Sequence, residues 1–395
     1  TQHMILAEID WEGAKRKVLM QAPKAGFFYI YDRETGELLS AEKYARSVTW
    51  ASHYDMETGR PVEVAGQDFA DESATVFPMG IGAHNWHPMS YSPRTGFVYI
   101  PAMEAGALMK DEPVFRASHR VFSTGNESDG AIHNAQLTQT MLPLVMKGYL
   151  MAWDPREQRS VWEVDHSAMG NGGTLATAGD LVFQGMIDGG FAAFDARDGS
   201  ARYRFATQNG IIGSPISYAV DGEQYIAIAA ARGGGLSAVL GRAYSRENAP
   251  VSGRLLVFRL GGDTELPPPA ELQPIPDPPA MPAVDDETLA RGSRLYSELC
   301  ARCHGTGVVA SGGIPDLRYM SSNTHASFES IVLGGAYESI GMPHFREELS
   351  EEADVAALHA YIIEQAHQDD QMRNGNPVWR AIKQAAYSAL AWVLF

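Results

Sequence analysis

A proline-rich stretch splits the 395-residue chain into two parts that have to fold separately. Residues 261–284 contain prolines singly, in pairs and in a run of three, and hold no aromatic side chain. Proline fixes φ and has no backbone N–H, so such a segment joins neither a helix interior nor a sheet and stays extended. We therefore expect a stiff linker at 261–284, a folded domain over residues 1–260, a second domain over residues 285–372 and a C-terminal tail over residues 373–395.

Composition and charge limit the kinds of partner. Hydrophobic residues make up 45% of the chain and charged residues 20%, which is typical of globular domains with substantial cores rather than of disordered chains. The formal net charge of −17 argues against nucleic acid or an anionic membrane as partner, and favours a basic protein partner or serves solubility alone. No apolar run reaches the length of a membrane span, so we do not expect this chain to be an integral membrane protein by itself.

Short strands are predicted throughout the part before the linker. Apolar and aromatic runs such as "GFFYIYD" and "DLVFQGM" are a few residues long and bounded by Gly, Asp or Pro, as antiparallel strands are. Several end in a related turn, in which Gly supplies the positive φ of a hairpin. The turns lie at residues 31–39, 54–62, 91–99, 153–162 and 194–203. Repeated hairpins of this kind predict radially arranged four-stranded sheets, an all-β propeller, while their irregular spacing leaves a sandwich as the alternative.

The two cysteines of the chain lie close together in the part after the linker. Cys300, Cys303 and His304 form the C-x-x-C-H arrangement that attaches a c-type haem through both thiols and supplies an axial imidazole ligand. A structural disulfide, a redox dithiol or half of a zinc site would also use a C-x-x-C pair. The chain has no second cysteine pair for a zinc site, and a redox dithiol does not require the histidine. The motif therefore favours one covalently bound haem c.

The flanks of this motif are predicted to be helical. Asp285 and Asp286 suit the start of a helix whose apolar stripe runs from Leu289 to Leu299. A second helix is predicted after Ser350, which suits the cap position ahead of an acidic first turn. This part of the chain is thus expected to be an all-α domain.

A methionine in the loop between these helices is the candidate for the second axial ligand. Met342 lies between a glycine and a proline, where a methionine has less reason to fill a core. Met320 and Met372 are the competing candidates. The order of cysteine helix, loop methionine and closing helix resembles a class I cytochrome c, which implies that Met342 binds iron opposite His304.

Longer segments carry a wider resemblance. "QAPKAGFFYIYDRETGELLSA", "AHNWHPMSYSPRTGFVYIP" and "GGTLATAGDLVFQG", followed by a proline-rich linker and a C-x-x-C-H domain, resemble the quinohaemoprotein alcohol dehydrogenases. The resemblance implies a pyrroloquinoline quinone (PQQ) propeller joined to a class I cytochrome c domain. The residues before the linker suffice for about five or six blades of forty to fifty residues, so we expect a partial PQQ-type propeller, about half or more of the family's eight-bladed ring.

The same resemblance assigns candidate cofactor contacts. Lys24 matches the basic residue that hydrogen-bonds the quinone oxygens, and Asn85 and Trp86 match a pair that contacts PQQ. Trp86 could instead serve blade packing. His84 and His87 lack a third ligand and are expected to be structural. The aspartate regarded as the catalytic base, and most calcium ligands, are expected upstream of residue 1, so no catalytic residue is assigned within the chain.

These features lead to two hypotheses about function. The first is oxidation of primary alcohols by PQQ, with calcium as a further cofactor and intramolecular electron transfer to haem c, in a chain that lacks the N-terminal half of its propeller. Its partners would be a small alcohol and a periplasmic acceptor, namely a cytochrome, a copper protein or a quinone-linked complex. The second is a haem c electron-transfer protein whose non-catalytic propeller fragment is a docking surface. A haem-bearing propeller nitrite reductase fits less well, because its domain order is reversed. Haem c attachment implies a periplasmic location, with the signal peptide outside this chain.

Overall fold

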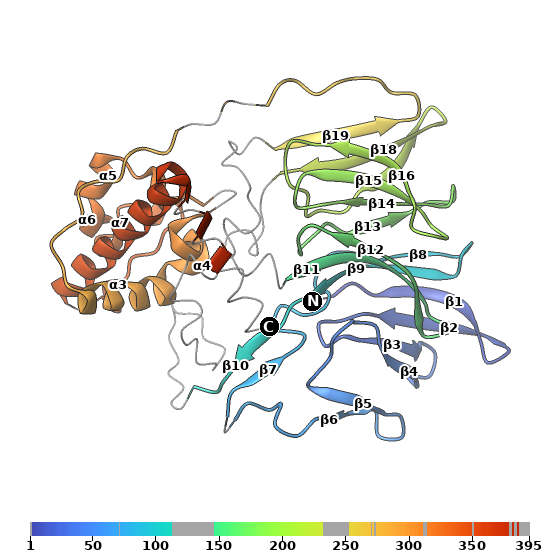
Figure 1. Ribbon diagram of the computed structural model, residues 1–395. Helices are drawn as coiled ribbons and strands as arrows, with labels where there is room; N and C mark the ends of the chain where they lie inside the picture. Colours follow the sequence, from blue (N-terminus) through green and yellow to red (C-terminus); the bar gives the residue numbers. More distant parts are fainter. Residues whose placement is uncertain are drawn as a thin grey trace. The chain divides into compact units, whose positions relative to one another are not determined.

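The computed structural model describes residues 2–70, 72–112, 146–231, 253–269, 271, 274–310, 314–349 and 351–378, with short pieces at 381–382 and 385–386 (Figure 1). These residues form two compact units, and the boundary between them in the sequence falls within the proline-rich stretch. The first unit is built of β-strands and the second of helices. The expected change from β-structure to helices is confirmed.

Antiparallel strands make up the first unit (Figure 1). They are β1 (Ile5–Trp11), β2 (Ala14–Gln21), β3 (Phe27–Asp32), β4 (Leu38–Lys43), β5 (Ala51–Asp55), β6 (Arg60–Glu63), β7 (Ala74–Val76), β8 (Ser90–Ser92), β9 (Phe97–Glu104), β10 (Ala107–Met109), β11 (Lys147–Asp154), β12 (Arg159–His166), β13 (Thr174–Ala176), β14 (Leu181–Gly185), β15 (Gly190–Asp195), β16 (Ala201–Ala206), β17 (Ile216–Val220), β18 (Glu223–Ala230) and β19 (Arg254–Arg259).

The strands pair into blade-like sheets. Three sheets have four strands, in the orders β1-β2-β3-β4, β12-β11-β9-β8 and β13-β14-β15-β16, and a further sheet has the order β17-β18-β19. Two-stranded sheets, β5-β6 and β10-β7, lie in the connections between them. Chain-order pairing within each sheet is what meandering propeller blades show.

All five predicted turns are hairpins in the structure. They join β3 to β4, β5 to β6, β8 to β9, β11 to β12 and β15 to β16. Gly36, Gly59, Gly96 and Gly199 have φ between 67° and 81°, a region where L side chains are strained. The β11–β12 turn has no glycine and places Gln158 there, with φ 52°.

Apolar side chains fill the spaces between successive sheets. One core joins the β1-β2-β3-β4 sheet to the β12-β11-β9-β8 sheet and includes Ile30 and Val98. The next joins that sheet to β13–β16 through Leu150 and Phe194, and a third joins β13–β16 to β17–β19. A two-layer sandwich has a single inter-sheet core, so this series of cores excludes the sandwich and confirms the propeller-type fold.

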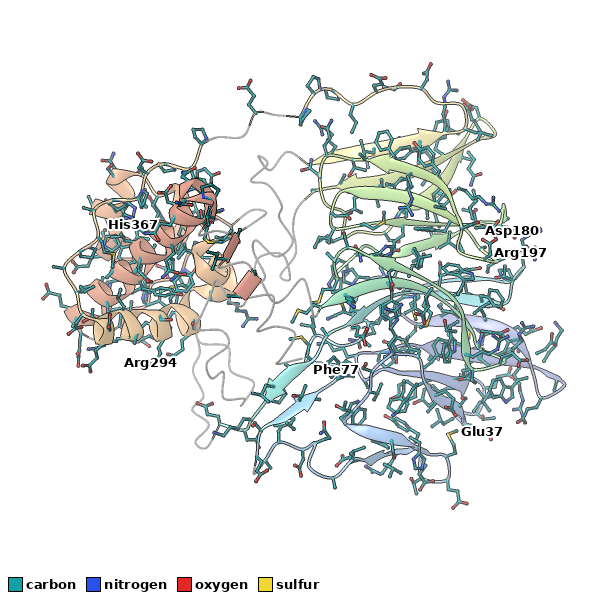
Figure 2. The ribbon with its side chains drawn as sticks, viewed as in Figure 1. Glu37, Phe77, Asp180, Arg197, Arg294 and His367 are labelled. Atoms are coloured by element: carbon teal, nitrogen blue, oxygen red, sulfur yellow. The ribbon has the colours of Figure 1, made fainter. Side chains whose placement is uncertain are left out.

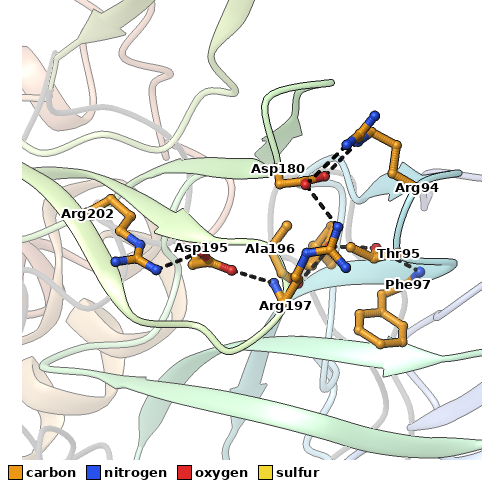
Figure 3. Close-up of polar contacts among 9 residues, drawn as sticks. Arg94, Thr95, Phe97, Asp180, Asp195, Ala196, Arg197 and Arg202 are labelled. Atoms are coloured by element: carbon orange, nitrogen blue, oxygen red, sulfur yellow. Dashed lines mark hydrogen bonds and ion pairs between the residues drawn. The ribbon is translucent and has the colours of Figure 1, made fainter.

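Charged turns link neighbouring sheets at one end of the first unit (Figure 3). Asp180, in the β13–β14 turn, accepts hydrogen bonds from Arg94 Nε at 2.9 Å and Arg197 Nη2 at 3.0 Å. Arg94 belongs to the β8–β9 turn and Arg197 to the β15–β16 turn. The hydrogen bonds from Arg94 and Arg197 lower the pKa of Asp180. Two of the predicted hairpin turns, β8–β9 and β15–β16, are thus joined through Asp180, and the bond from Arg94 links adjacent sheets.

Helices and short 3₁₀ turns make up the second unit. They are α3 (Asp286–Leu299), α4 (Ala301–His304), η2 (Thr306–Val308), η3 (Leu317–Tyr319), α5 (Ser322–Ala326), α6 (Phe328–Val332), η4 (Glu338–Ile340) and α7 (Glu352–Asn374). Asp285 caps α3 by accepting from Thr288 N, as predicted. The predicted Ser350 cap is wrong. Glu351 is the N-cap of α7 and forms a reciprocal capping box with Asp354, whose Oδ2 accepts from Glu351 N at 3.3 Å. Ser350 itself lies outside the described residues.

Each end of the proline-rich stretch contacts the unit next to it. Gln208 Nε2 donates to Pro267 O at 3.0 Å, and Leu266 packs against the core of β17–β19. At the other end, a ring nitrogen of His367 in α7, labelled in Figure 2, lies 2.8 Å from Pro279 O. Among the helices that the structure describes, none combines the length and apolar character needed to cross a bilayer.

Candidate functional site

The cysteine motif lies where α3 ends and α4 begins. Cys300 caps the C-terminus of α3, and its carbonyl accepts from the N–H groups of Cys303 at 3.1 Å and His304 at 2.8 Å. This single turn places both thiols and the imidazole within one short helix. Cys300 is buried, Cys303 is exposed, and both are free thiols, so the disulfide alternative is not what the structure shows. Burial raises the pKa of the Cys300 thiol to about 12.

His304 is oriented by a backbone carbonyl. Its Nδ1 lies 2.8 Å from Pro315 O and donates to it, which leaves Nε2 as the nitrogen with a free lone pair. Burial lowers the pKa of His304, and the neutral imidazole is the form that ligates a metal. A ring nitrogen held in this way is the usual arrangement for a metal-bound histidine.

Two of the three candidate methionines touch the core of the second unit. Met342 follows Gly341, whose φ is 101°, and its backbone N–H donates to Tyr337 O at 3.2 Å. Met342 and Met320 both pack against the cluster that contains Tyr296 and Cys300. Met372 lies in the last turns of α7. The assignment of Met342 as axial ligand stays a prediction, supported by its loop position beside this core.

The donor set of the second unit fits a c-type haem. Two free thiols two residues apart, an imidazole with its Nδ1 already bonded, and a thioether at the edge of an apolar core are the groups that such a haem uses. Tyr296, on the apolar stripe of α3, was not predicted as a site residue; it donates its hydroxyl hydrogen to Gly305 O at 2.7 Å and fixes the loop after His304.

The predicted cofactor contacts of the first unit are neighbours in space. Lys24 lies in the turn between β2 and β3, and its Nζ donates to Gly80 O at 3.0 Å. The Lys24 carbonyl accepts from Ala83 N at 3.0 Å. Gly82 has φ +88°, and a Cβ there would lie 2.5 Å from Lys24 Cα. Only glycine allows this backbone approach, so the 79–86 loop and the Lys24 turn form one cluster.

Asn85 and Trp86 extend this cluster. Asn85 Nδ2 donates to Ile81 O, and its Oδ1 accepts from Trp86 N, both at 2.9 Å. Trp86 is 47% exposed and stacks on the ring of His87, with centroids 4.2 Å apart. Trp86 as a contact of PQQ stays a prediction, which its exposed ring supports. His84 is fully buried, and its two ring nitrogens lie 2.5 and 2.6 Å from the carbonyl oxygens of Ala22 and His87.

The cluster of Lys24, Asn85 and Trp86 fits one side of an anionic planar quinone. Lys24 offers an exposed ammonium whose bond to Gly80 O leaves further hydrogens to donate, and Trp86 offers an exposed ring face for stacking. Calcium has no comparable support. In the described ranges, no group of three or more His, Cys, Asp or Glu side chains could hold a metal ion.

Two family models match the chain. One describes the glucose/ethanol/alcohol dehydrogenase β-propeller domain and matches residues 56–226. The other describes subunit III of the cbb3-type cytochrome c oxidase and matches residues 287–362. The first match falls before the proline-rich stretch, and the second covers the cysteine motif and the Met342 loop.

Curated relatives match nearly the whole chain. Quinohemoprotein alcohol dehydrogenase ADH IIB of Pseudomonas putida is 41% identical over 378 residues, which cover 95% of this chain and 53% of the relative. The 1-butanol dehydrogenase (cytochrome c) of Thauera butanivorans is 37% identical over 366 residues, which cover 92% of this chain and 52% of the relative. The chain thus spans about half the length of these curated relatives.

Solved structures show the same likeness. The quinohemoprotein alcohol dehydrogenase ADHIIG from Pseudomonas putida superposes with a TM-score of 0.83 at 38% identity, over 95% of this chain and 55% of that one. The enzyme from Comamonas testosteroni gives a TM-score of 0.75 at 33% identity, over 93% of this chain and 53% of that one.

Proposed function

The chain is homologous to the quinohaemoprotein alcohol dehydrogenases, and we propose that it serves the same reaction, oxidation of a primary alcohol by PQQ followed by intramolecular electron transfer to haem c. The observation that carries this proposal is the geometry of the cysteine motif. Cys300 and Cys303 are free thiols on one turn, and His304 presents Nε2 because its Nδ1 is bonded to Pro315 O.

Residues of the second unit would hold the haem. Cys300 and Cys303 would form its thioether bonds, and His304 and Met342 would be its axial ligands. A bound haem c supplies one-electron transfer. The apolar cluster around Cys300 and Met342 would exclude water from one side of it, which tunes its reduction potential.

Residues of the first unit would bind one side of PQQ, the two-electron acceptor. Lys24 would donate hydrogen bonds to the quinone oxygens and place a positive charge where negative charge develops on reduction. Asn85 holds the 81–86 turn, and Trp86 offers a ring face to the cofactor. The chain supplies no residue that we assign as the base for the alcohol proton. That aspartate and most calcium ligands would lie upstream of residue 1.

The remaining features of the proposal concern organisation and setting. We retain the division into a partial propeller (1–260), a linker (261–284), a cytochrome c domain (285–372) and a tail (373–395). The proposed location is the periplasm, where haem c is attached. The acceptor would be a cytochrome, a copper protein or a quinone-linked complex, and the net charge of −17 favours a basic docking face on it.

The proposal is tested by following haem reduction in the purified 395-residue chain. The chain is produced in a host that attaches haem c, PQQ and Ca²⁺ are titrated in, and haem absorbance is recorded after adding a primary alcohol. Lys24→Met is expected to weaken PQQ binding, measured by quenching of tryptophan fluorescence, because it removes the ammonium and keeps the side-chain length. Lys15→Met, at an exposed strand position, is the matched control.

The outcomes separate the two functions. Haem reduction that depends on PQQ, Ca²⁺ and alcohol supports the dehydrogenase and places a working base within this chain, against our expectation. Haem that is redox-active but unresponsive to alcohol supports the second function, an electron-transfer chain with a non-catalytic propeller fragment.

A further inference from the structure

Arg318 is a buried cation beside the segment that orients His304. It lies in η3, and its side chain is 1% exposed. Its Nη1 donates to Asp369 Oδ2 at 2.9 Å, and its Nε donates to Asp316 Oδ1 at 3.0 Å. Burial by itself would lower the pKa of Arg318, but the bonds to Asp316 and Asp369 outweigh burial and raise it. Arg318 is therefore a permanent charge held in a fixed geometry.

The ion pairs of Arg318 attach one short turn to the last long helix. Asp316 is the N-cap of η3 and accepts from Arg318 N at 3.0 Å as well as from its guanidinium. Asp369 belongs to α7 and accepts a second hydrogen bond from Arg373 Nε at 2.7 Å. Pro315 directly precedes Asp316. The position of the Pro315 carbonyl is thus set by the attachment of this turn to α7.

We propose that Arg318 is a positioning residue for the haem-binding histidine. By fixing the turn after Pro315 to α7, Arg318 holds the Pro315 carbonyl 2.8 Å from His304 Nδ1. A hydrogen bond at Nδ1 makes the imidazole a more basic ligand, and a more basic ligand favours ferric iron and lowers the reduction potential. This inference rests on the proposed haem function and adds to it a residue that sets the potential.

The sign of the potential shift distinguishes positioning from a direct effect of charge. If Arg318 acts through His304, its loss weakens the Nδ1 bond, makes the imidazole less basic and raises the potential. If Arg318 acts only as a nearby positive charge, its loss disfavours the extra electron of ferrous haem and lowers the potential. A purely structural role would reduce stability and leave the potential unchanged.

The experiment is a spectroelectrochemical titration of the full-length, haem-loaded chain without PQQ or alcohol. Arg318→Gln is expected to shift the ferric/ferrous equilibrium about threefold to tenfold toward ferrous haem, which is about 30 to 60 mV for a one-electron couple. Arg318→Lys keeps the charge but cannot bridge two carboxylates, so a smaller rise is expected. Arg294→Gln is the matched control, because Arg294 is exposed on α3 (Figure 2) and its loss removes the same charge from the same unit.

A lowered or unchanged potential in Arg318→Gln would overturn the proposal. If Arg318→Gln fails to fold, the Arg318→Lys variant distinguishes positioning from a direct effect of charge. Positioning predicts a raised potential and faster solvent exchange of the His304 Nδ1 proton, measured by NMR in the ferrous state, whereas charge alone predicts no change in either. Failure of the wild-type chain to attach haem would refute the proposed function instead. Attached haem with an unshifted potential in both variants refutes only the role of Arg318.

Discussion

Gly292→Ala is expected to destabilise the second unit, because α3 and α7 approach each other too closely at this position to admit a methyl group. A Cβ at Gly292 would lie 2.1 Å from Ala357 O and 2.9 Å from Tyr361 Cβ. The first of these is a backbone atom of α7 and cannot move aside as a flexible side chain would, so the helices must separate.

The expected change in the free energy of unfolding follows from two opposing effects. Overpacking costs about 3 kcal/mol at the upper end of the usual range, which fits a clash with backbone. Replacing glycine by alanine inside a helix stabilises the helix by about 1 kcal/mol. The net loss of about 2 kcal/mol corresponds to a fall in Tm of roughly 8 to 16 °C for a domain of under a hundred residues.

The assay is thermal and urea unfolding of the haem-loaded chain, followed by haem absorbance and by helical circular dichroism. Glu298→Ala, at an exposed position of the same helix, is the control and is expected to change Tm little, because alanine fits a helix well and nothing is crowded. A Gly292→Ala variant as stable as the wild type would refute the argument that the close helix contact requires glycine.

Three further predictions concern other parts of the chain. Burial lowers the pKa of His359 to about 4, so below pH 6.5 the unfolded state binds a proton that the folded state does not. The urea midpoint of the second unit should therefore decrease as the pH is lowered from 6.5 to 4, and it should decrease less steeply in His359→Gln. Leu255 and Val257 are 72% and 48% exposed on β19, and exposed apolar side chains on a strand favour self-association. Replacing both by lysine should therefore lower the mean mass measured by light scattering, and an unchanged mass would show that this face does not drive association. Asp180→Asn removes the carboxylate that joins two turns and should lower Tm slightly at low salt, with the difference from wild type vanishing near 1 M salt, where the Debye length is about 3 Å.

Local sequence signals predicted the parts of the structure that depend on neighbouring residues. Four of the five hairpin turns follow from Thr-Gly or Asp-Gly dipeptides that favour a positive φ, and the start of α3 follows from Asp285 as a cap. The N-cap of α7 lies one residue after the predicted position, because serine and glutamate side chains can both accept hydrogen bonds at a helix start and the sequence does not show where the helical backbone begins.

Contacts between distant segments could not be predicted in this way. The residues of the buried ion network, Arg318 and Asp369, are 51 positions apart, and each by itself is typical of an exposed charged residue in the sequence. Only the return of α7 past η3 brings them together. The sequence does not reveal the pairing of His325 with His359 for the same reason: their ring nitrogens lie 2.9 Å apart, and both side chains are partly buried.

The two proposed redox sites differ in how much of the fold they require. Cys300, Cys303, His304 and Met342 all lie within one helical unit, and the turn at the end of α3 is enough to place the first three. Lys24 meets the 80–83 segment only because the β2–β3 turn and the loop before β8 come together when two sheets pack, with Gly82 allowing the contact. The haem site can therefore form in a chain whose propeller sheets are perturbed, whereas the quinone contacts depend on intact packing between sheets. Gly82→Ala should accordingly weaken PQQ binding and leave the haem spectrum unchanged, because it displaces Lys24 within the first unit.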